Sequence, residues 1–313
     1  MASARSLPLR RRLLLLLAPG VALVASACST ASGGGALASQ SGISIERDVP
    51  YASGPRRLLD IYRPEAGEGG LPLTLFFHGG QWQMGSKDSL ENHVIAMGLA
   101  ERGAVVLAAN YRLYPETRFP GFLEDAAAAV AWARRHAARL GADPDAIFVA
   151  GHSAGGYMAL MLALDGQWLA REGLDHRDLA GAIGIAGPYA GNFPRHWAVS
   201  PVFAGQPDLA PLLPESFAAA DAPPLLLLGG DMDGIVGASQ LRIMEERVVR
   251  AGGRVESRVY PGIGHLGILM SLPWLPSLAP TAADIMRFVT RQHVRRMAAR
   301  APLPPDIRQA AAP

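Results

Sequence analysis

The fold is decided by one stretch of sequence, Ile147-Phe148-Val149-Ala150-Gly151-His152-Ser153-Ala154-Gly155. Its first four residues are apolar and predict a buried strand, and Tyr157-Met158-Ala159-Leu160 just beyond it predicts a helix. Between them lies the pattern G-x-S-x-G, in which a serine occupies a sharp strand-to-helix turn and small neighbours let strand and helix approach closely. The pattern alone is weak in a chain with 35 glycines among 313 residues. Its position between a strand and a helix favours a nucleophilic Ser153 over a glycine-rich turn without chemistry.

Strand and helix patterns alternate on both sides of this stretch. Short apolar runs predict strands at residues 43–49, 58–62, 73–77, 104–109, 146–150, 179–186, 224–228 and 254–260, the first two as a hairpin. Helical patterns end near residue 102 and cover residues 120–140, 153–164, 241–251 and 281–299. Strands that are buried on both faces read as nearly continuous apolar runs, as the central ones do here. This alternation predicts an α/β fold with a mostly parallel central sheet flanked by helices.

One long connection breaks the alternation. Residues 187–222 have no clear periodicity and carry Phe193, Trp197 and Phe203 among several prolines. The segment is too small for a full cap domain, so we expect a minimal cap of loops and short helices lying over the site. The alternative is a surface excursion without function.

A second glycine-rich segment follows an early strand. His78-Gly79-Gly80 comes directly after residues 73–77, where glycines would let backbone N–H groups face a substrate without obstruction by side chains. We expect the amides of Gly79 and Gly80, together with that of Ala154, to bind a developing oxyanion. The alternative is a plain glycine-rich turn. His78 is expected to orient the loop rather than to act in catalysis.

Two aspartates compete for the role of the acid that orients a catalytic histidine. Both Asp231 and Asp233 follow the predicted strand at residues 224–228, and the spacing from Gly230 favours Asp233. The histidine should come last in the chain, in the order Ser, Asp, His. Only His265 and His293 follow the aspartates, and His265 is favoured because it lies in a loop after a strand.

Residues 49–297 resemble the α/β-hydrolase superfamily, in the esterase/lipase branch that includes hormone-sensitive-lipase-like and bacterial feruloyl-esterase-like members. Kynurenine-formamidase-like enzymes are related. The resemblance rests on His78-Gly79-Gly80, Asn110-Tyr111-Arg112-Leu113-Tyr114-Pro115-Glu116, Gly151 to Gly156, and the late Asp233 and His265. It implies the α/β-hydrolase fold and acyl transfer by a triad. The chain departs from the lipase-like pattern at Gln81, where many members have a third glycine, and it lacks the large N-terminal cap.

The expected activity is that of a serine carboxylic-ester hydrolase acting on a small-molecule ester through an acyl-enzyme. Such a mechanism needs no metal and no cofactor. One alternative is an arylformamidase-like enzyme that cleaves an N-formyl amide. A second is a non-catalytic protein of the hydrolase fold that binds a ligand, although a binding protein would not need all of Ser153, Asp233 and His265.

The N-terminal sequence predicts export. Four arginines precede an apolar run, and the small residues Ala25-Ser26-Ala27 lead to Cys28. We expect residues 1–27 to be a signal peptide, Cys28 to carry a lipid, and residues 28–42 to be a flexible tether to a catalytic domain at residues 43–300. The expected location is a bacterial cell envelope, with the protein held at a membrane by its lipid. The alternative is simple secretion to the periplasm or medium. Residues 301–313, rich in proline, are expected to be a disordered tail.

Composition narrows the remaining possibilities. The formal net charge is only +2 and the body of the chain has no basic block, so nothing indicates binding to nucleic acid. Cys28 is the one cysteine, which excludes an intramolecular disulfide framework and a cysteine-based zinc site. The sequence does not indicate an oligomeric state.

Overall fold

Eight strands form one mixed sheet in the computed structural model, which describes residues 42–65, 69–272 and 276–301. The strands are β1 Ile43–Pro50, β2 Leu58–Pro64, β3 Leu71–Phe77, β4 Val105–Ala109, β5 Ala142–His152, β6 Gly181–Ile185, β7 Leu225–Gly230 and β8 Val255–Tyr260. Their order across the sheet is β1-β2-β4-β3-β5-β6-β7-β8. The β1–β2 and β2–β4 pairs are antiparallel, and every other pair is parallel. This is the mostly parallel sheet, with an N-terminal hairpin at one edge, that the sequence predicts.

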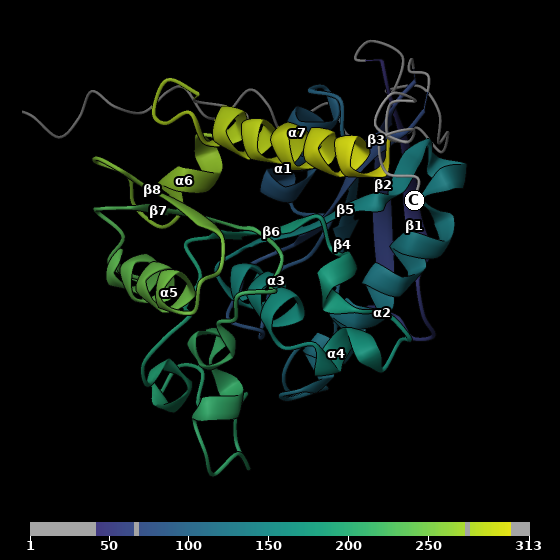
Figure 1. Ribbon diagram of the computed structural model, residues 1–313. Coiled ribbons are helices and arrows are strands. Elements are labelled where there is room, and N and C mark those ends of the chain that lie inside the picture. The colour runs from purple at the N-terminus through teal and green to yellow at the C-terminus, as the bar shows by residue number, and fades with distance from the viewer. Residues whose placement is uncertain (1–41, 66–68, 273–275, 302–313) are drawn as a thin grey trace, which may run out of the picture. The chain divides into compact units, whose positions relative to one another are not determined.

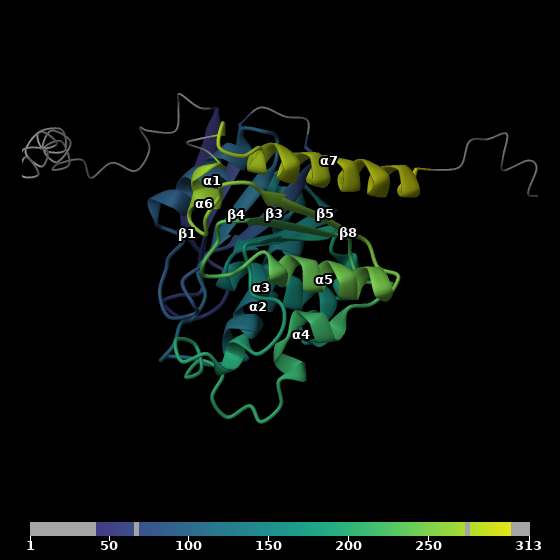
Figure 2. The same cartoon turned by 90° about the vertical axis from the view of Figure 1, so that its left-hand side faces the viewer.

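The helices lie on both faces of the sheet. They are α1 Leu90–Ala100, α2 Gly121–His136, α3 Ala154–Leu164, α4 Gln167–Ala170, α5 Ser239–Arg250, α6 Gly267–Met270 and α7 Thr281–Arg300. Short 3-10 helices cover Ala138–Leu140, His176–Asp178, Phe193–Arg195, Ala210–Leu212 and Pro214–Phe217. In Figure 1, α1 and α7 cover one face, while α2, α3 and α5 cover the other, and Figure 2 shows the same division from the side.

Two hydrophobic cores follow from this arrangement, one on each face. One core contains Phe122 of α2 and Met158 of α3, and the other contains Ile95 of α1 and Phe288 of α7. All residues of β4, β6 and β7 are buried, because these central strands are covered on both sides. The edge strand β8 is buried only at its last residue, Tyr260, and is partly or fully exposed elsewhere.

The sequence pattern places the eight strands and the five longer helices, but it misses the short helices α4 and α6 and some boundaries. The helix that ends near residue 102 begins only at Leu90, so residues 78–89 form a loop. Backbone geometry explains the loop, because Gly80, Gln81 and Trp82 all have positive φ angles, of 116°, 56° and 58°. A run of such angles is incompatible with a right-handed helix. Residues 187–222 form turns and short 3-10 helices, as expected.

The predicted N-terminal and C-terminal segments lie outside the described residues. These are the signal peptide at residues 1–27, the tether at residues 28–42 apart from Gly42, and the tail at residues 301–313 apart from Ala301. Among the helices that the structure describes, none combines the length and the apolar character needed to cross a bilayer.

The parallel strands end at the same edge of the sheet, and this edge collects the candidate residues. Gly79 follows β3, Ser153 follows β5, Asp233 follows β7 and His265 follows β8. In open α/β sheets, ligands bind in the crevice beyond the carboxyl ends of the strands. The topology therefore brings together residues that are up to 186 positions apart, from Gly79 to His265.

Replacing Gly155 with alanine tests the close packing of α3 against the sheet. A Cβ atom at Gly155 would lie 2.0 Å from the carbonyl oxygen of Phe77, a backbone atom that cannot move freely. Gly155→Ala should lower the free energy of unfolding by roughly 1–3 kcal/mol, as overpacking does. At Gly237 a Cβ atom would meet nothing closer than 3.6 Å, so Gly237→Ala is the control. Urea denaturation of both variants checks the prediction, and equal stabilities would contradict it.

Candidate active site

Ser153 occupies a strained turn between β5 and α3. Its φ and ψ angles are 53° and −116°, and it stands immediately before the first residue of α3. The backbone N–H of Ser153 donates to the carbonyl of Ile185 at the end of β6, 2.8 Å away. A non-glycine residue with this φ persists only where its surroundings force it, and such strain is concentrated at active sites.

The surroundings that force this turn are two backbone contacts. A Cβ atom at Gly151 would lie 2.3 Å from the carbonyl carbon of Gly155, and one at Gly155 would meet Phe77. Only glycine fits at either position, so the chain must turn sharply at Ser153. The pattern that selected Ser153 in the sequence therefore has a steric cause.

His265 and Asp233 form a buried pair. Nδ1 of His265 lies 2.8 Å from Oδ2 of Asp233, and the two side chains are 9% and 1% exposed. Because a carboxylate only accepts, Nδ1 carries the proton and Nε2 is left as an acceptor. The other carboxylate oxygen accepts the backbone N–H groups of Ile235 and Val236, 2.9 and 2.8 Å away. Three donors thus fix the orientation of Asp233.

The competing aspartate has a different contact. Oδ1 of Asp231 accepts the backbone N–H of Gly262, 2.7 Å away, in the loop that leads to His265. Asp231 is exposed, whereas Asp233 is buried. Of the two candidates from the sequence, the structure places Asp233 against His265 and Asp231 against the loop. His293, the other histidine that follows the aspartates, lies in α7, and α7 and α3 cover opposite faces of the sheet (Figure 1).

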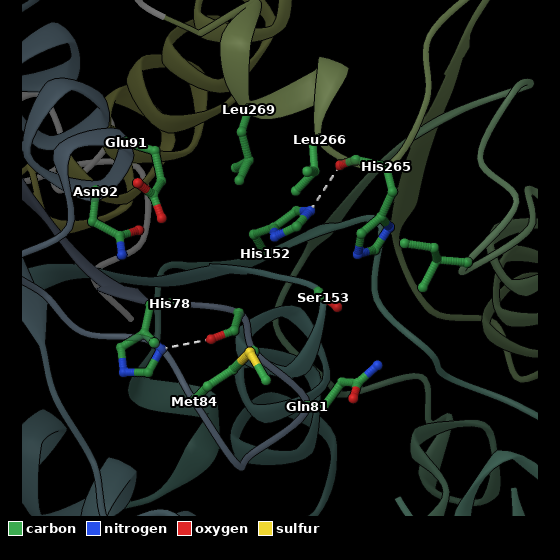
Figure 3. A pocket seen from close by; sticks show the side chains of 14 residues that line it. His78, Gln81, Met84, Glu91, Asn92, His152, Ser153, His265, Leu266 and Leu269 are labelled. Carbon is green, nitrogen blue, oxygen red and sulfur yellow. Dashed lines mark hydrogen bonds between the residues drawn. The ribbon is translucent and has the colours of Figure 1, made fainter. Parts of the chain in front are cut away.

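Ser153 and His265 line one pocket of about 420 Å³, here called the first pocket. In Figure 3, His152 and His265 lie beside Ser153, with Leu266 and Leu269 beyond them. No hydrogen bond joins the hydroxyl of Ser153 to the ring of His265 in the described part of the chain. Catalytic hydrogen bonds are often long when no substrate is bound, so this spacing is compatible with a nucleophile and its base.

A second pocket of about 360 Å³ also opens at Ser153. The two pockets share Gln81, Ser153 and Ile235, and the second is lined by residues of the 187–222 segment, such as Phe193 and His196. That segment therefore lies at the site, as expected for a minimal cap. Neither pocket has a lysine or arginine among the described residues that line it.

The predicted oxyanion donors lie around Ser153. A Cβ atom at Gly79 would be 2.9 Å from Nδ1 of His152 and 3.3 Å from Cβ of Ser153. Gly80 has a φ of 116°, and a Cβ atom there would be 2.1 Å from the carbonyl oxygen of Met84. Ala154 begins α3, so its N–H is one of the first four of a helix, which lack partners within the helix. Gly79 and Gly80 line the first pocket, and Ala154 lines the second.

Comparison with known proteins assigns the chain to a family. The BD-FAE family model matches residues 59–177. Esterase LipC of Mycobacterium tuberculosis is 30% identical over 271 residues, which are 80% of this chain and 66% of LipC. The chain belongs to the esterase/lipase branch of the α/β-hydrolase superfamily. It spans 56 to 66% of the length of three curated relatives, LipC among them.

Solved structures agree with this assignment. A truncated carbohydrate esterase from gut microbiota superposes with a TM-score of 0.71 at 21% identity, over 82% of this α/β-hydrolase and 98% of that chain. Esterase 2 of Thermogutta terrifontis, in a form phosphorylated by paraoxon, gives a TM-score of 0.59 at 27% identity, over 72% of this chain and 84% of that one. The fold implied by the sequence resemblance is confirmed.

Arg56 is a contributor to this α/β-hydrolase site that the sequence patterns missed. Its guanidinium donates to the backbone carbonyls of Tyr111 and Gly85, 2.8 and 2.9 Å away, and lies 3.5 Å from Nε2 of His78. Nδ1 of His78 donates to the carbonyl of Gly79, 2.6 Å away, so Nε2 is free to accept from Arg56. His78 thus holds the loop that carries Gly79, which is the role expected from the sequence.

The motif at residues 110–116 explains part of this support. Tyr111 stacks on the ring of His78 at 4.4 Å and donates its hydroxyl proton to the carbonyl of His78, 2.9 Å away. The side-chain oxygen of Asn110 accepts the N–H of Lys87, 2.7 Å away. The motif that marks the family therefore fastens the loop at both of its ends. A search for the partners of His78 within that motif could have found Tyr111.

Lys87 anchors the far end of the loop through charge. Its ammonium group is buried and lies 2.7, 2.8 and 2.6 Å from carboxylate oxygens of Asp48, Asp60 and Asp88. The hydrogen bonds that the Lys87 ammonium donates to these carboxylates outweigh the effect of burial and raise the pKa of Lys87. A buried ammonium without such partners would be strongly unfavourable, so the cluster fixes residues 84–89 against β1 and β2.

His152, inside the nucleophile motif, supports the loop of His265. Its Nε2 donates to the carbonyl oxygen of His265, 3.0 Å away, and the two rings are 4.6 Å apart (Figure 3). Burial, together with the neighbouring His265, lowers the pKa of His152 to about 3, and burial lowers the pKa of His78 to about 4. Both rings are therefore neutral at ordinary pH.

The buried His152 should make stability depend on pH. Below about pH 6.5 the unfolded chain binds a proton at His152 that the native chain does not bind until about pH 3. The free energy of unfolding should therefore fall as pH falls through this window, by up to about 1.4 kcal/mol per pH unit for this one group. His152→Gln removes the titrating ring while keeping an N–H donor. Urea denaturation between pH 4 and 6.5 should give a shallower slope for the variant, and identical slopes would contradict the prediction.

Proposed function

We propose that this α/β-hydrolase is a serine carboxylesterase that acts through Ser153, His265 and Asp233. The observation that carries the proposal is the pairing of Asp233, at 2.8 Å, with His265, which lines the same pocket as the strained Ser153. Relatives named as esterases, and an esterase structure phosphorylated by paraoxon, support the same reaction class.

The reaction would proceed in two steps. His265 takes the proton of the Ser153 hydroxyl at Nε2, and the oxygen of Ser153 bonds to the ester carbonyl carbon. The bond from that carbon to the alcohol oxygen then breaks, and the proton on Nε2 passes to the departing alcohol. Water attacks the resulting acyl-enzyme in the same way and releases the acid. Asp233 holds the imidazole in the tautomer that has Nε2 free and stabilises its protonated form.

The backbone supplies the charge stabilisation. In the tetrahedral intermediate the former carbonyl oxygen is negative, and we assign its donors to the N–H groups of Gly79, Gly80 and Ala154. Loss of a single donor of this kind typically slows the reaction by about 10²–10³-fold. No step requires a metal or a cofactor.

The test of this proposal is Ser153→Ala. The variant should lose labelling by a fluorescent fluorophosphonate and nearly all hydrolysis of p-nitrophenyl butyrate, with its circular dichroism spectrum unchanged. Activity within a few-fold of the wild type would contradict the assignment of the nucleophile. Labelling without hydrolysis of any ester, but with release of formate from an N-formyl arylamine, would favour the formamidase alternative. A wild-type protein that shows neither labelling by the fluorophosphonate nor hydrolysis of an ester or N-formyl amide would favour a non-catalytic binding protein.

The two aspartates provide a matched pair for the same test. Asp233→Asn places an amide beside Nδ1 of His265 and selects the wrong tautomer, a change that lowers kcat by about 10⁴-fold in a related triad. Asp231→Asn keeps an oxygen that can accept the N–H of Gly262, so its effect should be small. A larger loss in Asp231→Asn would contradict the assignment of the acid.

We also propose that the protein is an exported lipoprotein, held at a membrane of a bacterial cell envelope through Cys28. The apolar run, the small residues before Cys28 and the Ser/Gly-rich segment after it support this location. Two or more acyl chains on one cysteine would give stable membrane attachment, whereas one chain gives only marginal attachment.

Cys28→Ala tests the location. The wild-type protein should sediment with membranes, and the variant should either remain unprocessed or appear in the soluble fraction. Mass spectrometry of the mature N-terminus should find a diacylglycerol-modified cysteine. An unmodified Cys28 in a soluble protein would instead support simple secretion.

A further inference from the structure

The two pockets that meet at Ser153 differ in which parts of the catalytic machinery they contain. His265 lines the first pocket and not the second, whereas Ala154 lines the second pocket and not the first. Ser153 lies at the junction, together with Gln81 and Ile235. The site therefore has two directions in which the parts of an ester can extend, and only one of them passes His265.

The chemistry of the leaving group distinguishes the two directions. When the bond between the carbonyl carbon and the alcohol oxygen breaks, Nε2 of His265 must hand its proton to that oxygen. Proton transfer requires the two atoms to be within hydrogen-bond reach, about 2.6–3.2 Å. The alcohol oxygen must therefore lie on the side of the pocket that His265 lines. The acyl group is attached to the same carbon and must extend away from it.

From this geometry we infer that the first pocket receives the alcohol part of the substrate and that the second pocket receives the acyl part. The inference rests on the proposed function, because it needs His265 as the proton donor. It assigns Leu266 and Met84 to selection of the alcohol, and Asn192 and Phe193 to selection of the acid.

The lining of the first pocket indicates the class of alcohol. Met84 and Leu266 are 63% and 64% exposed, and together with Leu269 they give this pocket an apolar wall. The histidines in it are His78, His152 and His265, of which the first two are neutral, and Glu91 is its other titratable side chain. In Figure 3, Glu91 lies at the opposite end of the pocket from His265. Such a pocket fits a hydrocarbon alcohol and disfavours one that carries a negative charge.

The second pocket is lined by aromatic rings and by side-chain amides. The rings of Trp82 and Phe193 stack at 6.2 Å with an angle of 19° between their planes. The carbonyl oxygen of the Gln240 side chain accepts the N–H groups of Tyr189 and Ala190, both 2.8 Å away. Its amide nitrogen has no protein acceptor among the described residues. The side-chain amide of Asn192 likewise has no partner there.

These groups give the second pocket both an aromatic wall and free hydrogen-bonding groups. It can therefore hold a larger acyl group than acetyl, including one with polar substituents. Ester hydrolysis by this protein should consequently be selective on both sides of the ester bond, with separate residues responsible for each side.

Two series of esters separate the two pockets. In the alcohol series, acetates are made with methanol through octanol, and in the acyl series, methyl esters are made with acetic through decanoic acid. Acid release is followed in a pH-stat, and kcat/KM is determined for each ester. The ratio of the longest to the shortest member then measures alcohol selectivity and acyl selectivity separately.

Two exposed positions allow each pocket to be changed without disturbing the core. Leu266→Ala removes apolar wall from the first pocket, and Asn192→Trp fills part of the second. Leu266→Ala should lower the octyl-to-methyl ratio by roughly tenfold and leave the acyl ratio within twofold of wild type. Asn192→Trp should lower the decanoate-to-acetate ratio by at least about tenfold and leave the alcohol ratio unchanged.

Matched controls use exposed residues that line neither pocket. Val249→Ala on α5 shortens an exposed apolar side chain, and Asp208→Trp adds an indole in the 187–222 segment. Both should leave the two ratios unchanged. Three outcomes would overturn the inference and leave the proposed function intact. These are the reverse pattern, an effect of either pocket variant on both ratios, and no effect of either pocket variant on any ratio. Failure of the wild-type protein to hydrolyse any ester would instead overturn the proposed function and the inference with it.

Discussion

The close contact between α3 and the strands beneath it governs the rest of this active site. Gly155 lies against the backbone carbonyls of Phe77 and His78, and Gly151 lies against Gly155, so no side chain can separate helix from sheet. The chain can pass from β5 into α3 only by taking up the strained conformation of Ser153. The same contact places Gly79, at the beginning of the loop of residues 78–89, directly beside the candidate nucleophile Ser153. One steric constraint therefore sets both the position of the Ser153 hydroxyl and that of the backbone amides proposed as oxyanion donors.

The other components of the site are held by groups that take no part in the chemistry. Tyr111 holds the beginning of the loop of residues 78–89 through His78, Arg56 holds it through Gly85, and Lys87 fixes its end by charge. Asp231 and His152 hold the loop that carries His265, each through a single backbone group. Positioning of this kind matters because a displacement of about 1 Å can slow a reaction by 10²-fold. In both loops, the hydrogen bonds that hold the backbone lie within a few residues of the candidate site residue.

The sequence alone predicted the sheet and the candidate residues because each left a local signal. Apolar runs marked the buried strands, and Ser153 stood in a short motif with a steric basis. The partners of the loops left no such signal. Arg56 lies 22 positions before His78 and in a turn with no periodicity, and the positive φ angles of Gln81 and Trp82 are imposed by tertiary packing. Trp82 is buried among Phe122, Tyr157 and Phe203, contacts between segments that no single stretch of sequence reveals.

The same limit applies to the roles of the aspartates. Asp231 and Asp233 are two positions apart and follow the same strand, so the sequence could only rank them by spacing. Their side chains alternate in direction, one toward His265 and the other toward Gly262, and that difference exists only once β8 and its following loop have packed beside β7. Pairing between distant strands, rather than local propensity, distinguishes the two.

The charges around the pockets also bear on the end of the reaction cycle. In the proposed reaction, hydrolysis would convert a neutral ester into a carboxylate, so the product would carry a charge that the substrate does not. Glu91 lines the first pocket and Asp233 contacts His265, while no lysine or arginine lines either pocket in the described chain. The two histidines nearest the loop remain uncharged. Under the proposed function, the carboxylate product would therefore find no lysine or arginine counter-ion among the described residues that line either pocket, and its departure into water would be favoured.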